Sequence, residues 1–272
     1  MSCSQTAIDE ANTMSASFAD RLGLVLGDRL VGVYLVGSYA LGDMQAGSDV
    51  DVIVVVGGTV TDPDVSKLRE LHAWMASTYP ARPFEGFYAD LEDLRLGNEP
   101  CSLRMRFAGD ELHEREAASL IERETLRRCG AVVAGRPAAD LGVFDSSAHL
   151  AAFSHRNLSE YWAPWLERTA PRLMGAVAVG PLRKQAAWAA AWCVLGVTRL
   201  HAAIADGNIV SKTEAGRRAL KCFDAKWHPV VNAALDYRLN GDGPSTKRLG
   251  GLRSDARAFS SHVVEAALAL PV

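Results

Sequence analysis

Val33–Val56 reads VYLVGSYALGDMQAGSDVDVIVVV, which is two apolar runs joined by a polar turn. The first run ends in Gly37-Ser38, and the second starts beside Asp49 and Asp51. Side chains alternate between the two faces of a strand, so we expect Asp49 and Asp51 to project from the same face. The stretch therefore predicts a strand, a turn and a second strand that carries a pair of carboxylates.

Asp49 and Asp51 carry like charges and repel each other unless a cation or a set of hydrogen-bond donors neutralises them. Ligand sets made only of oxygen are typical of Mg²⁺ or Mn²⁺ rather than of zinc. Gly37 lets a phosphate group approach the backbone closely, and Ser38 places a hydroxyl group beside it. We therefore interpret the turn as a phosphate-binding site and the acid pair as a metal site; a solvated strand start is the alternative.

The chain has the composition of a globular protein with a substantial core, because 49% of its 272 residues are hydrophobic and 22% are charged. Its formal net charge of −3 argues against a general nucleic-acid-binding protein, which is usually basic. The N-terminal residues lack the apolar core of a secretory signal, and the apolar run Ala186–Val197 is shorter than a membrane span. Five widely spaced cysteines without a C-x-x-C pattern predict neither a disulfide framework nor a zinc site, and they fit a reducing cytoplasm: Cys3, Cys101, Cys129, Cys193 and Cys222.

Patterns of helices and strands alternate in the first half of the chain. Helical periodicity covers about residues 5–30 and 63–79, and Asp62 before Pro63 is the expected N-cap of the second helix. Strand-like patterns follow at 82–89 (RPFEGFYA), 101–107 and 131–137, and residues 114–129 look helical. The acidic stretch Asp90–Asp93 is expected to form a turn that is either solvated or part of a site for a cationic acceptor.

After Pro137 the chain is expected to be helical throughout. Helical patterns cover residues 149–168, divided near Pro164, as well as 182–206, 229–239 and 255–270. Another helix is expected to start at Ser211, because Ser211 and Glu214 have the spacing of a capping box. We therefore predict an α/β (α+β) first domain with a small mixed sheet, residues 1–142, and an all-α helical bundle domain, residues 143–272.

Glu85 is the candidate for a third carboxylate. It lies near the acid pair if its strand pairs with the strand of Asp49 and Asp51. Three carboxylates can hold one or two Mg²⁺ ions that bridge the phosphates of a nucleoside triphosphate. A carboxylate that is not fully committed to metal can deprotonate an attacking hydroxyl group, and we predict that Glu85 is this base. An exposed glutamate on an edge strand is the alternative interpretation.

The turn and the acid pair described above resemble the signature of a known family. Gly37-Ser38 followed by Asp49-Val50-Asp51 is similar to the signature of the polymerase-beta-like nucleotidyltransferase superfamily. FEGFY, around Glu85, stands where the aminoglycoside adenylyltransferases that act on streptomycin and spectinomycin carry their catalytic strand glutamate.

The second half resembles the same enzymes through VTRLH at residues 197–201 and DGNIVSK at residues 206–212. This resemblance implies that Arg199 and Lys212 contact the triphosphate, with Tyr237 near the nucleotide, and that the helical domain closes over the cleft. The alternative for Arg199 and Lys212 is a solvated helix surface.

The segment Ala186–Trp192 departs from the family pattern, because it contains no carboxylate where the family places the acids that bind a cationic drug. This departure leaves the nucleotidyl chemistry in place but does not support an aminoglycoside as the acceptor. Four tryptophans of the second half either pack between helices, which is the more common role at helical spacing, or stack on a ligand. They are Trp162, Trp165, Trp188 and Trp192.

The sequence thus predicts a cytoplasmic, Mg²⁺-dependent nucleotidyltransferase, either a monomer or a dimer. It would move AMP from ATP to a hydroxyl group of a small acceptor, an aminoglycoside-type antibiotic being one candidate, and release pyrophosphate. Two alternatives stay open: a nucleotidyltransferase that acts on RNA or protein, and a catalytically silent nucleotide-binding protein of the same fold.

Overall fold

The computed structural model describes residues 3–58, 60–96, 105–114, 118–174, 181–241 and 244–271. The chain divides into two compact units, Met1–Ser146 and Ser147–Val272, which separate a few residues after the division expected at residue 142. Within the described residues, every strand belongs to the first unit and the second unit is helical. The predicted fold class, a small mixed sheet with helices followed by a helical region, is confirmed.

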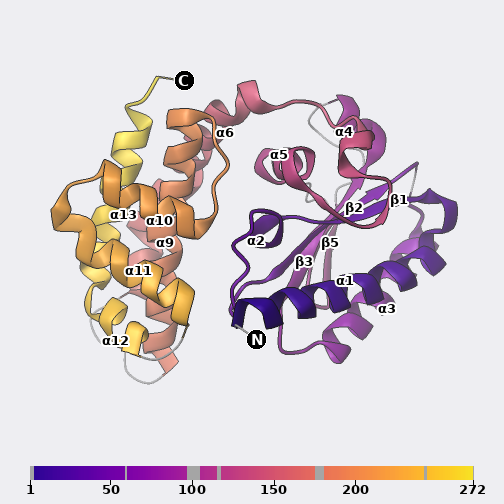
Figure 1. Ribbon diagram of the computed structural model, residues 1–272, viewed down its shortest axis with the longest axis horizontal. Coiled ribbons are helices and arrows are strands. Elements are labelled where there is room, and N and C mark those ends of the chain that lie inside the picture. Colours follow the sequence, from indigo (N-terminus) through magenta and orange to yellow (C-terminus); the bar gives the residue numbers. More distant parts are fainter. Residues whose placement is uncertain are drawn as a thin grey trace. The chain divides into compact units, whose positions relative to one another are not determined.

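The first unit is built on a mixed sheet (Figure 1). The sheet has six strands in the order β5-β4-β3-β2-β1-β6. β2 and β3 run parallel, and the other neighbouring strands are antiparallel. A parallel pair requires a crossover connection, which helix α3 supplies between β2 and β3. The strands are β1 (Leu30–Leu35), β2 (Val50–Val56), β3 (Phe84–Asp90), β4 (Met105–Ala108), β5 (Glu111–Glu114) and β6 (Ala131–Gly135).

Helices cover both faces of this sheet. Helices α1 (Cys3–Leu26) and α3 (Asp62–Thr78) pack on one face, and α4 (Leu91–Leu96) and α5 (Leu120–Cys129) lie on the other (Figure 1). The short helix α2 (Gly37–Ala40) follows β1 directly. From Val52 to Val56, strand β2 is therefore buried on both sides, which explains the run of Val and Ile after Asp51.

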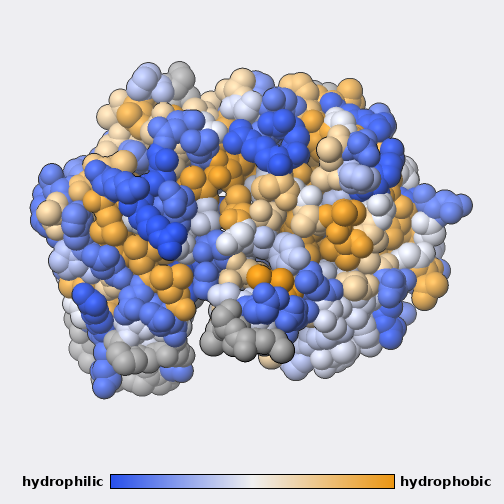
Figure 2. All heavy atoms as spheres, in the orientation of Figure 1, coloured by the Kyte–Doolittle hydropathy of each residue, from blue (hydrophilic) through white to orange (hydrophobic). Residues whose placement is uncertain are grey.

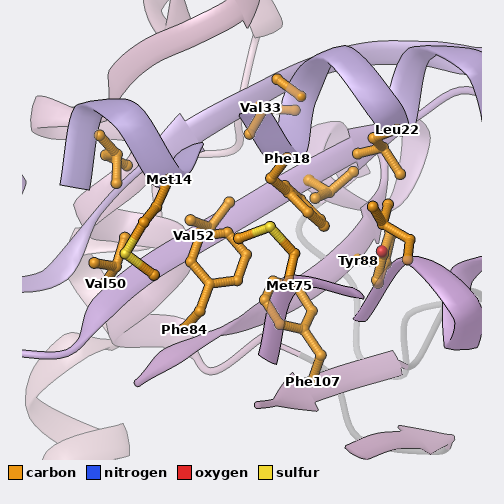
Figure 3. Close-up of a cluster of buried hydrophobic side chains, with 14 of the residues drawn as sticks. Met14, Phe18, Leu22, Val33, Val50, Val52, Met75, Phe84, Tyr88 and Phe107 are labelled. Atoms are coloured by element: carbon orange, nitrogen blue, oxygen red, sulfur yellow. The ribbon is translucent and has the colours of Figure 1, made fainter. Parts of the chain in front are cut away.

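The larger core of the first unit lies between the sheet and helices α1 and α3. Figure 3 shows Met14, Phe18 and Leu22 of α1 and Met75 of α3 beside side chains of the strands. The alternate residues of β2, Ile53 and Val55, face the other way and pack with Leu126 of α5 in the smaller core. Asp51 is two positions before Ile53, so alternation places it on the side of the smaller core.

One polar pair interrupts the larger core. His72 of α3 is fully buried, and its Nε2 lies 2.9 Å from the hydroxyl oxygen of Tyr88. Its ring also packs against Phe107, with the two ring centroids 4.4 Å apart. Burial lowers the pKa of His72 to about 4 and raises the pKa of Tyr88 well above its ordinary value. The folded protein therefore favours a neutral imidazole at this position.

Two helix starts differ from the sequence prediction. Thr61 rather than Asp62 is the N-cap of α3, and its capping box uses the carboxylate of Asp64. The hydrogen bonds of Asp64 with Arg29 and Thr61 hold the pKa of this carboxyl well below its usual range. The expected acidic turn after β3 is instead the start of α4, because the carboxylate of Asp90 accepts a hydrogen bond of 2.8 Å from the backbone N–H of Glu92.

The segment expected to be one helix over 114–129 also differs. Its first residue ends strand β5, and α5 begins only at Leu120, after a capping box between Ser119 and Glu122. Residues 115–117 lie outside the described part of the chain. The strand expected over 101–107 is present as β4 from Met105 onward, and residues 101–104 also lie outside the described part.

The second unit is a helical bundle arranged around α9 (Pro181–Asp206), which packs against α6, α10, α11, α12 and α13. The helix expected over 149–168 is divided by a π-helical turn at Leu158–Trp162, just before Pro164. The short helices α8 and α12 were not expected from the sequence. The remaining bounds are α6 (Leu150–Asn157), α7 (Ala163–Arg168), α8 (Ala170–Leu173), α10 (Lys212–Cys222), α11 (His228–Asn240), α12 (Pro244–Gly251) and α13 (Arg253–Leu268).

Helix α9 has the bounds expected from the sequence to within one residue, but as a whole it is more apolar than its longest uninterrupted apolar run indicates. Leu182–Asp206 is long and apolar enough to cross a membrane, although 72% of its most apolar window is buried inside the protein. A buried core helix of a bundle passes the same test, so α9 is weak evidence for a membrane protein. Figure 2 shows hydrophilic residues mixed with hydrophobic ones over the drawn face, in keeping with a chain that is 22% charged.

We expect His72 to make the stability of the protein depend on pH. The unfolded chain protonates this imidazole near the ordinary pKa of 6.5, whereas the folded protein does so only near 4. The contribution to stability is therefore present above about pH 6.5 and is lost as the pH falls towards about 4. From this group alone, the free energy of unfolding should fall by about 2 kcal/mol between about pH 7 and about pH 5.

Urea unfolding followed by circular dichroism at the two pH values tests this expectation. The variant His72→Phe, which keeps an aromatic ring among Phe18 and Phe107, should show a smaller fall in unfolding free energy than the wild type. The exposed His149 offers a matched control, and His149→Gln should keep the wild-type pH dependence. Equal pH dependence in wild type and His72→Phe would contradict the assignment.

Candidate functional site

The carboxylates of Asp51 and Glu85 stand on neighbouring strands at the same level. β2 pairs with β3 in parallel, and in this register Asp51 lies opposite Glu85. Strand pairing thus meets the condition under which the sequence placed Glu85 near the acid pair. Both residues are partly exposed and line one pocket on the α5 side of the sheet. Two carboxylates that lie side by side on neighbouring strands can bind a metal ion, or one of them can act as a base.

Asp49 immediately precedes β2 and stands two positions before Asp51. The chain next to it is held by Arg82, whose Nη1 donates a hydrogen bond of 2.7 Å to the backbone carbonyl of Ser48. Arg82 is itself fixed by an ion pair of 2.6 Å with Glu10 of α1. These contacts tie the segment before Asp49 to the rest of the first unit.

Gly37 brings the turn after β1 against Asp51. Its φ of +54° lies in the left-handed region, and a Cβ atom at this position would collide with the carboxylate of Asp51. The backbone N–H of Val36 also donates a hydrogen bond of 2.9 Å to the carbonyl of Asp51. Ser38, at the start of α2, lies within 3.4 Å of the sulfur of Met44 through its Oγ. The structure therefore places the predicted phosphate-binding turn against Asp51, one of the two predicted acids.

Two residues that the sequence analysis did not assign to the site also line this pocket, Arg106 of β4 and Glu122 of α5. Nη2 of Arg106 donates a hydrogen bond of 3.2 Å to Oε2 of Glu85. Oε2 of Glu122 accepts a hydrogen bond of 2.7 Å from the backbone N–H of Ser119. The Ser119-x-x-Glu122 spacing predicts a helix start and so a defined position for Glu122. The position of Arg106 depends on strand order, which the sequence does not give.

The donor set fits Mg²⁺ in chemistry, although no group of three His, Cys, Asp or Glu side chains surrounds one metal position among the described residues. The predicted arrangement of Asp49, Asp51 and Glu85 is therefore not assembled as a three-ligand cluster. Mg²⁺ keeps several waters and takes one or two protein carboxylates together with phosphate oxygens. Asp51, with Asp49 before it on the chain and Glu85 opposite, supplies oxygen donors of this type.

In the second unit the structure brings Arg199 to the segment that precedes Lys212. Nε of Arg199, on α9, donates a hydrogen bond of 3.0 Å to the carbonyl of Val210. Lys212 is the first residue of α10, whose N-cap Ser211 accepts a hydrogen bond from the backbone N–H of Glu214. Two of the predicted triphosphate contacts thus belong to one local arrangement. Tyr237 lies on another helix, α11, and is partly buried.

The four tryptophans for which the sequence left two roles open pack against one another in the second unit. The rings of Trp162 and Trp192 have centroids 4.3 Å apart, and Trp188 stacks on Trp192 with an interplanar angle of 11°. Trp165 contacts the same cluster, and Trp188 is half exposed at its edge. The alanines of Ala186–Trp192 are buried where α9 packs with its neighbours, so these positions have no room for solvated carboxylates.

Comparisons with known proteins agree with both halves of this description. Residues 23–84 match the nucleotidyltransferase domain family, and residues 174–266 match the family described as aminoglycoside adenylyltransferase, C-terminal domain. No curated protein matches the chain. Among solved structures, the chain is similar to spectinomycin adenyltransferase AAD(9) from Enterococcus faecialis, determined with ATP and spectinomycin. The TM-score is 0.67 at 15% identity, over 94% of this chain and 99% of that one, which is a likeness of fold.

We expect Gly37→Ala to destabilise the protein more than Gly42→Ala. Both glycines have a positive φ, which costs a side-chain-bearing residue roughly 1 kcal/mol. A Cβ at Gly42 meets no atom within 4 Å, whereas one at Gly37 collides with Asp51. The difference between the two free energies of unfolding, about 1 kcal/mol or more, measures the collision.

Chemical denaturation of the two single variants and of Gly37→Ala combined with Asp51→Ala checks this expectation. Removing the carboxylate should relieve most of the extra cost, because the closest collision is with its oxygen and the two substitutions act on one contact. Equal destabilisation by Gly37→Ala and Gly42→Ala would mean that the turn does not lie against Asp51.

Proposed function

This chain is a nucleotidyltransferase whose second half carries the aminoglycoside adenylyltransferase C-terminal domain, and we propose that it transfers AMP from ATP to a hydroxyl group of a small acceptor. The observation that carries the proposal is the parallel register that sets Asp51 opposite Glu85 beside the Gly37 turn. The acceptor in this proposal is of the aminoglycoside type, as the name of the C-terminal domain family indicates.

Each candidate site residue of the first unit has a defined role in the proposed reaction. The backbone at Gly37 and the hydroxyl group of Ser38 would bind the triphosphate. Asp49 and Asp51 would hold Mg²⁺, and Glu85 stands opposite Asp51 as the base. When bound, the metal ions neutralise charge on the phosphate oxygens and stabilise the transition state. Glu85 accepts the proton of the acceptor hydroxyl group as its oxygen attacks the α-phosphorus. The bond from the α-phosphorus to the bridging oxygen breaks, and pyrophosphate leaves.

The second unit supplies cations in this proposal. Arg199 and Lys212 belong to one local arrangement around Val210, and Lys212 stands in the first turn of α10, where backbone N–H groups favour an anion. We propose that these two side chains bind the triphosphate and that Tyr237 lies near the nucleotide. The buried alanines of Ala186–Trp192 provide no acids for a cationic acceptor, so other residues recognise it.

We expect pyrophosphate release from Mg²⁺ and ATP only when a suitable acceptor is present. An acceptor panel that contains streptomycin, spectinomycin and other hydroxyl-bearing aminoglycosides tests this, with the adenylated product identified by mass spectrometry. Chelation of the metal should abolish turnover. Absence of product with every acceptor, combined with labelled protein or RNA bands when labelled ATP is added to a cell lysate, would contradict the small-acceptor assignment.

Substitution of the two site carboxylates tests their roles. We expect Asp51→Asn to lower kcat more than about 100-fold, because the metal loses a charged ligand. Glu85→Gln should lower kcat about 10²–10⁴-fold through loss of the base, with a much smaller effect on the KM for ATP. Glu92→Gln, at an exposed carboxylate of α4, is the matched control and should keep wild-type activity. An undiminished kcat in Asp51→Asn would remove the metal assignment.

Arg199→Ala and Lys212→Ala should each raise the KM for ATP about tenfold or more, because a charge-assisted contact with the triphosphate is lost. The exposed Arg217 of α10 is the matched control, and Arg217→Ala should leave the KM for ATP unchanged. Steady-state kinetics at varied ATP, with the thermal midpoint recorded for each variant, separates lost binding from lost folding. An unchanged KM in both variants would contradict the triphosphate role of the second unit.

A further inference from the structure

Arg106 is placed against the catalytic face of the sheet by the antiparallel pairing of β3 and β4. In this register Arg106 lies opposite Phe87, and Glu85 lies opposite Ala108. Arg106 and Glu85 are therefore diagonal neighbours on one face, a distance that a long side chain spans. The guanidinium of Arg106 reaches back to Glu85, with 3.2 Å between Nη2 and Oε2, and its Cζ lies 5.7 Å from the centroid of the Phe87 ring.

The charges of this pocket make the contact between Arg106 and Glu85 important. Among the described residues that line it, the charged side chains are three acids, Asp51, Glu85 and Glu122, and one cation, Arg106. One oxygen of Glu122 is engaged with the start of α5 through the backbone N–H of Ser119. Asp51 and Glu85 stand opposite each other on adjacent strands, where like charges are unfavourable. Arg106 is therefore the side chain of this lining that offsets their repulsion.

The contact also restricts the conformation of Glu85. A glutamate side chain has several rotatable bonds, and confining it costs conformational entropy. Arg106 forms the one side-chain hydrogen bond that Glu85 makes within the described part of the chain, and it uses Oε2. The other oxygen, Oε1, is left to accept the proton of an acceptor hydroxyl group. A general base must hold its oxygen within hydrogen-bond reach of that proton, and small displacements lower the rate strongly.

We propose that Arg106 is a positioning residue for the reaction, which ties Oε2 of Glu85 so that Oε1 faces the acceptor hydroxyl group. The proposal rests on the proposed function of this site. Arginine suits the role because its planar guanidinium holds a carboxylate in a defined direction, whereas lysine offers a point charge on a flexible chain. Phe87 beneath the guanidinium limits its movement further.

The test compares Arg106→Met, Arg106→Lys and Arg106→Ala with the wild type in the pyrophosphate-release assay. We expect Arg106→Met to lower kcat about tenfold or more and to leave the KM for ATP within about twofold, because the triphosphate is bound by other residues. Arg106→Lys should keep more of the kcat than Arg106→Met. Millimolar guanidinium ion should restore part of the kcat of Arg106→Ala, and sodium chloride at the same ionic strength should not.

The same hairpin offers a matched control. Glu111 of β5 is exposed and pairs with His113 rather than with a site residue, so Glu111→Gln should keep the wild-type kcat. Calorimetric titration of each variant with Mg²⁺ and a non-hydrolysable ATP analogue gives a readout independent of turnover. Its dissociation constant should stay within about twofold of the wild type in Arg106→Met.

The outcomes separate this inference from the proposed function. An active wild type with an equally active Arg106→Met overturns the positioning role and leaves the function standing. A fall in kcat accompanied by weaker binding of the ATP analogue, with no recovery from lysine or guanidinium ion, indicates a merely structural residue and also overturns it. A wild type that adenylates no acceptor overturns the proposed function, and the positioning role fails with it.

Discussion

The parallel pairing of β2 with β3 is the constraint on which the site depends. It sets Asp51 and Glu85 side by side on the face of the sheet towards α5. Because side chains alternate along a strand, a shift of one residue in either strand would turn one carboxylate into the larger core. Val52, Phe84 and Tyr88, which point into that core, hold the register by hydrophobic packing. The hydrophobic effect thus positions the two charged groups that it excludes from the interior.

A parallel pair needs a long connection, and this connection also organises the first unit. Helix α3 crosses from β2 to β3 and, with α1, covers the face of the sheet opposite the acids. The buried pair of His72 and Tyr88 lies in this layer and favours a neutral imidazole. The core that α3 covers and the two acids lie on opposite faces of the same two strands, so packing of α3 contributes to holding the register of Asp51 and Glu85.

The second unit is organised by helix packing around α9 rather than by strand pairing. Its central helix α9 uses alanines to let neighbouring helices approach closely, and its tryptophans form a cluster with those of the preceding helices. The same helix carries Arg199, whose guanidinium is held by the carbonyl of Val210 close to the start of α10. A tightly packed helix thus presents a cation at a defined place, while its buried alanine positions leave no room for acids.

Much of the fold was readable from local patterns. The Val and Ile run of β2, the alternation of FEGFY and the helical periodicity of the second half all predicted the elements that the structure contains. The sequence prediction was wrong at helix starts where more than one residue can cap the helix. Thr61 rather than Asp62 caps α3, and helix α4 begins directly after Asp90 where a turn was expected. In both cases the choice depends on hydrogen bonds that form only in the folded chain.

The sequence by itself determined the chemistry available to this protein. A Gly-Ser turn and an Asp-x-Asp pair are local features, and Glu85 was recognisable as an acid on a separate strand. Only the tertiary structure decided that Glu85 stands opposite Asp51 and that Arg106, not assigned to the site from the sequence, touches Glu85. Strand order and register come from the packing of residues far apart in the chain, and local periodicity carries no information about which strands become neighbours.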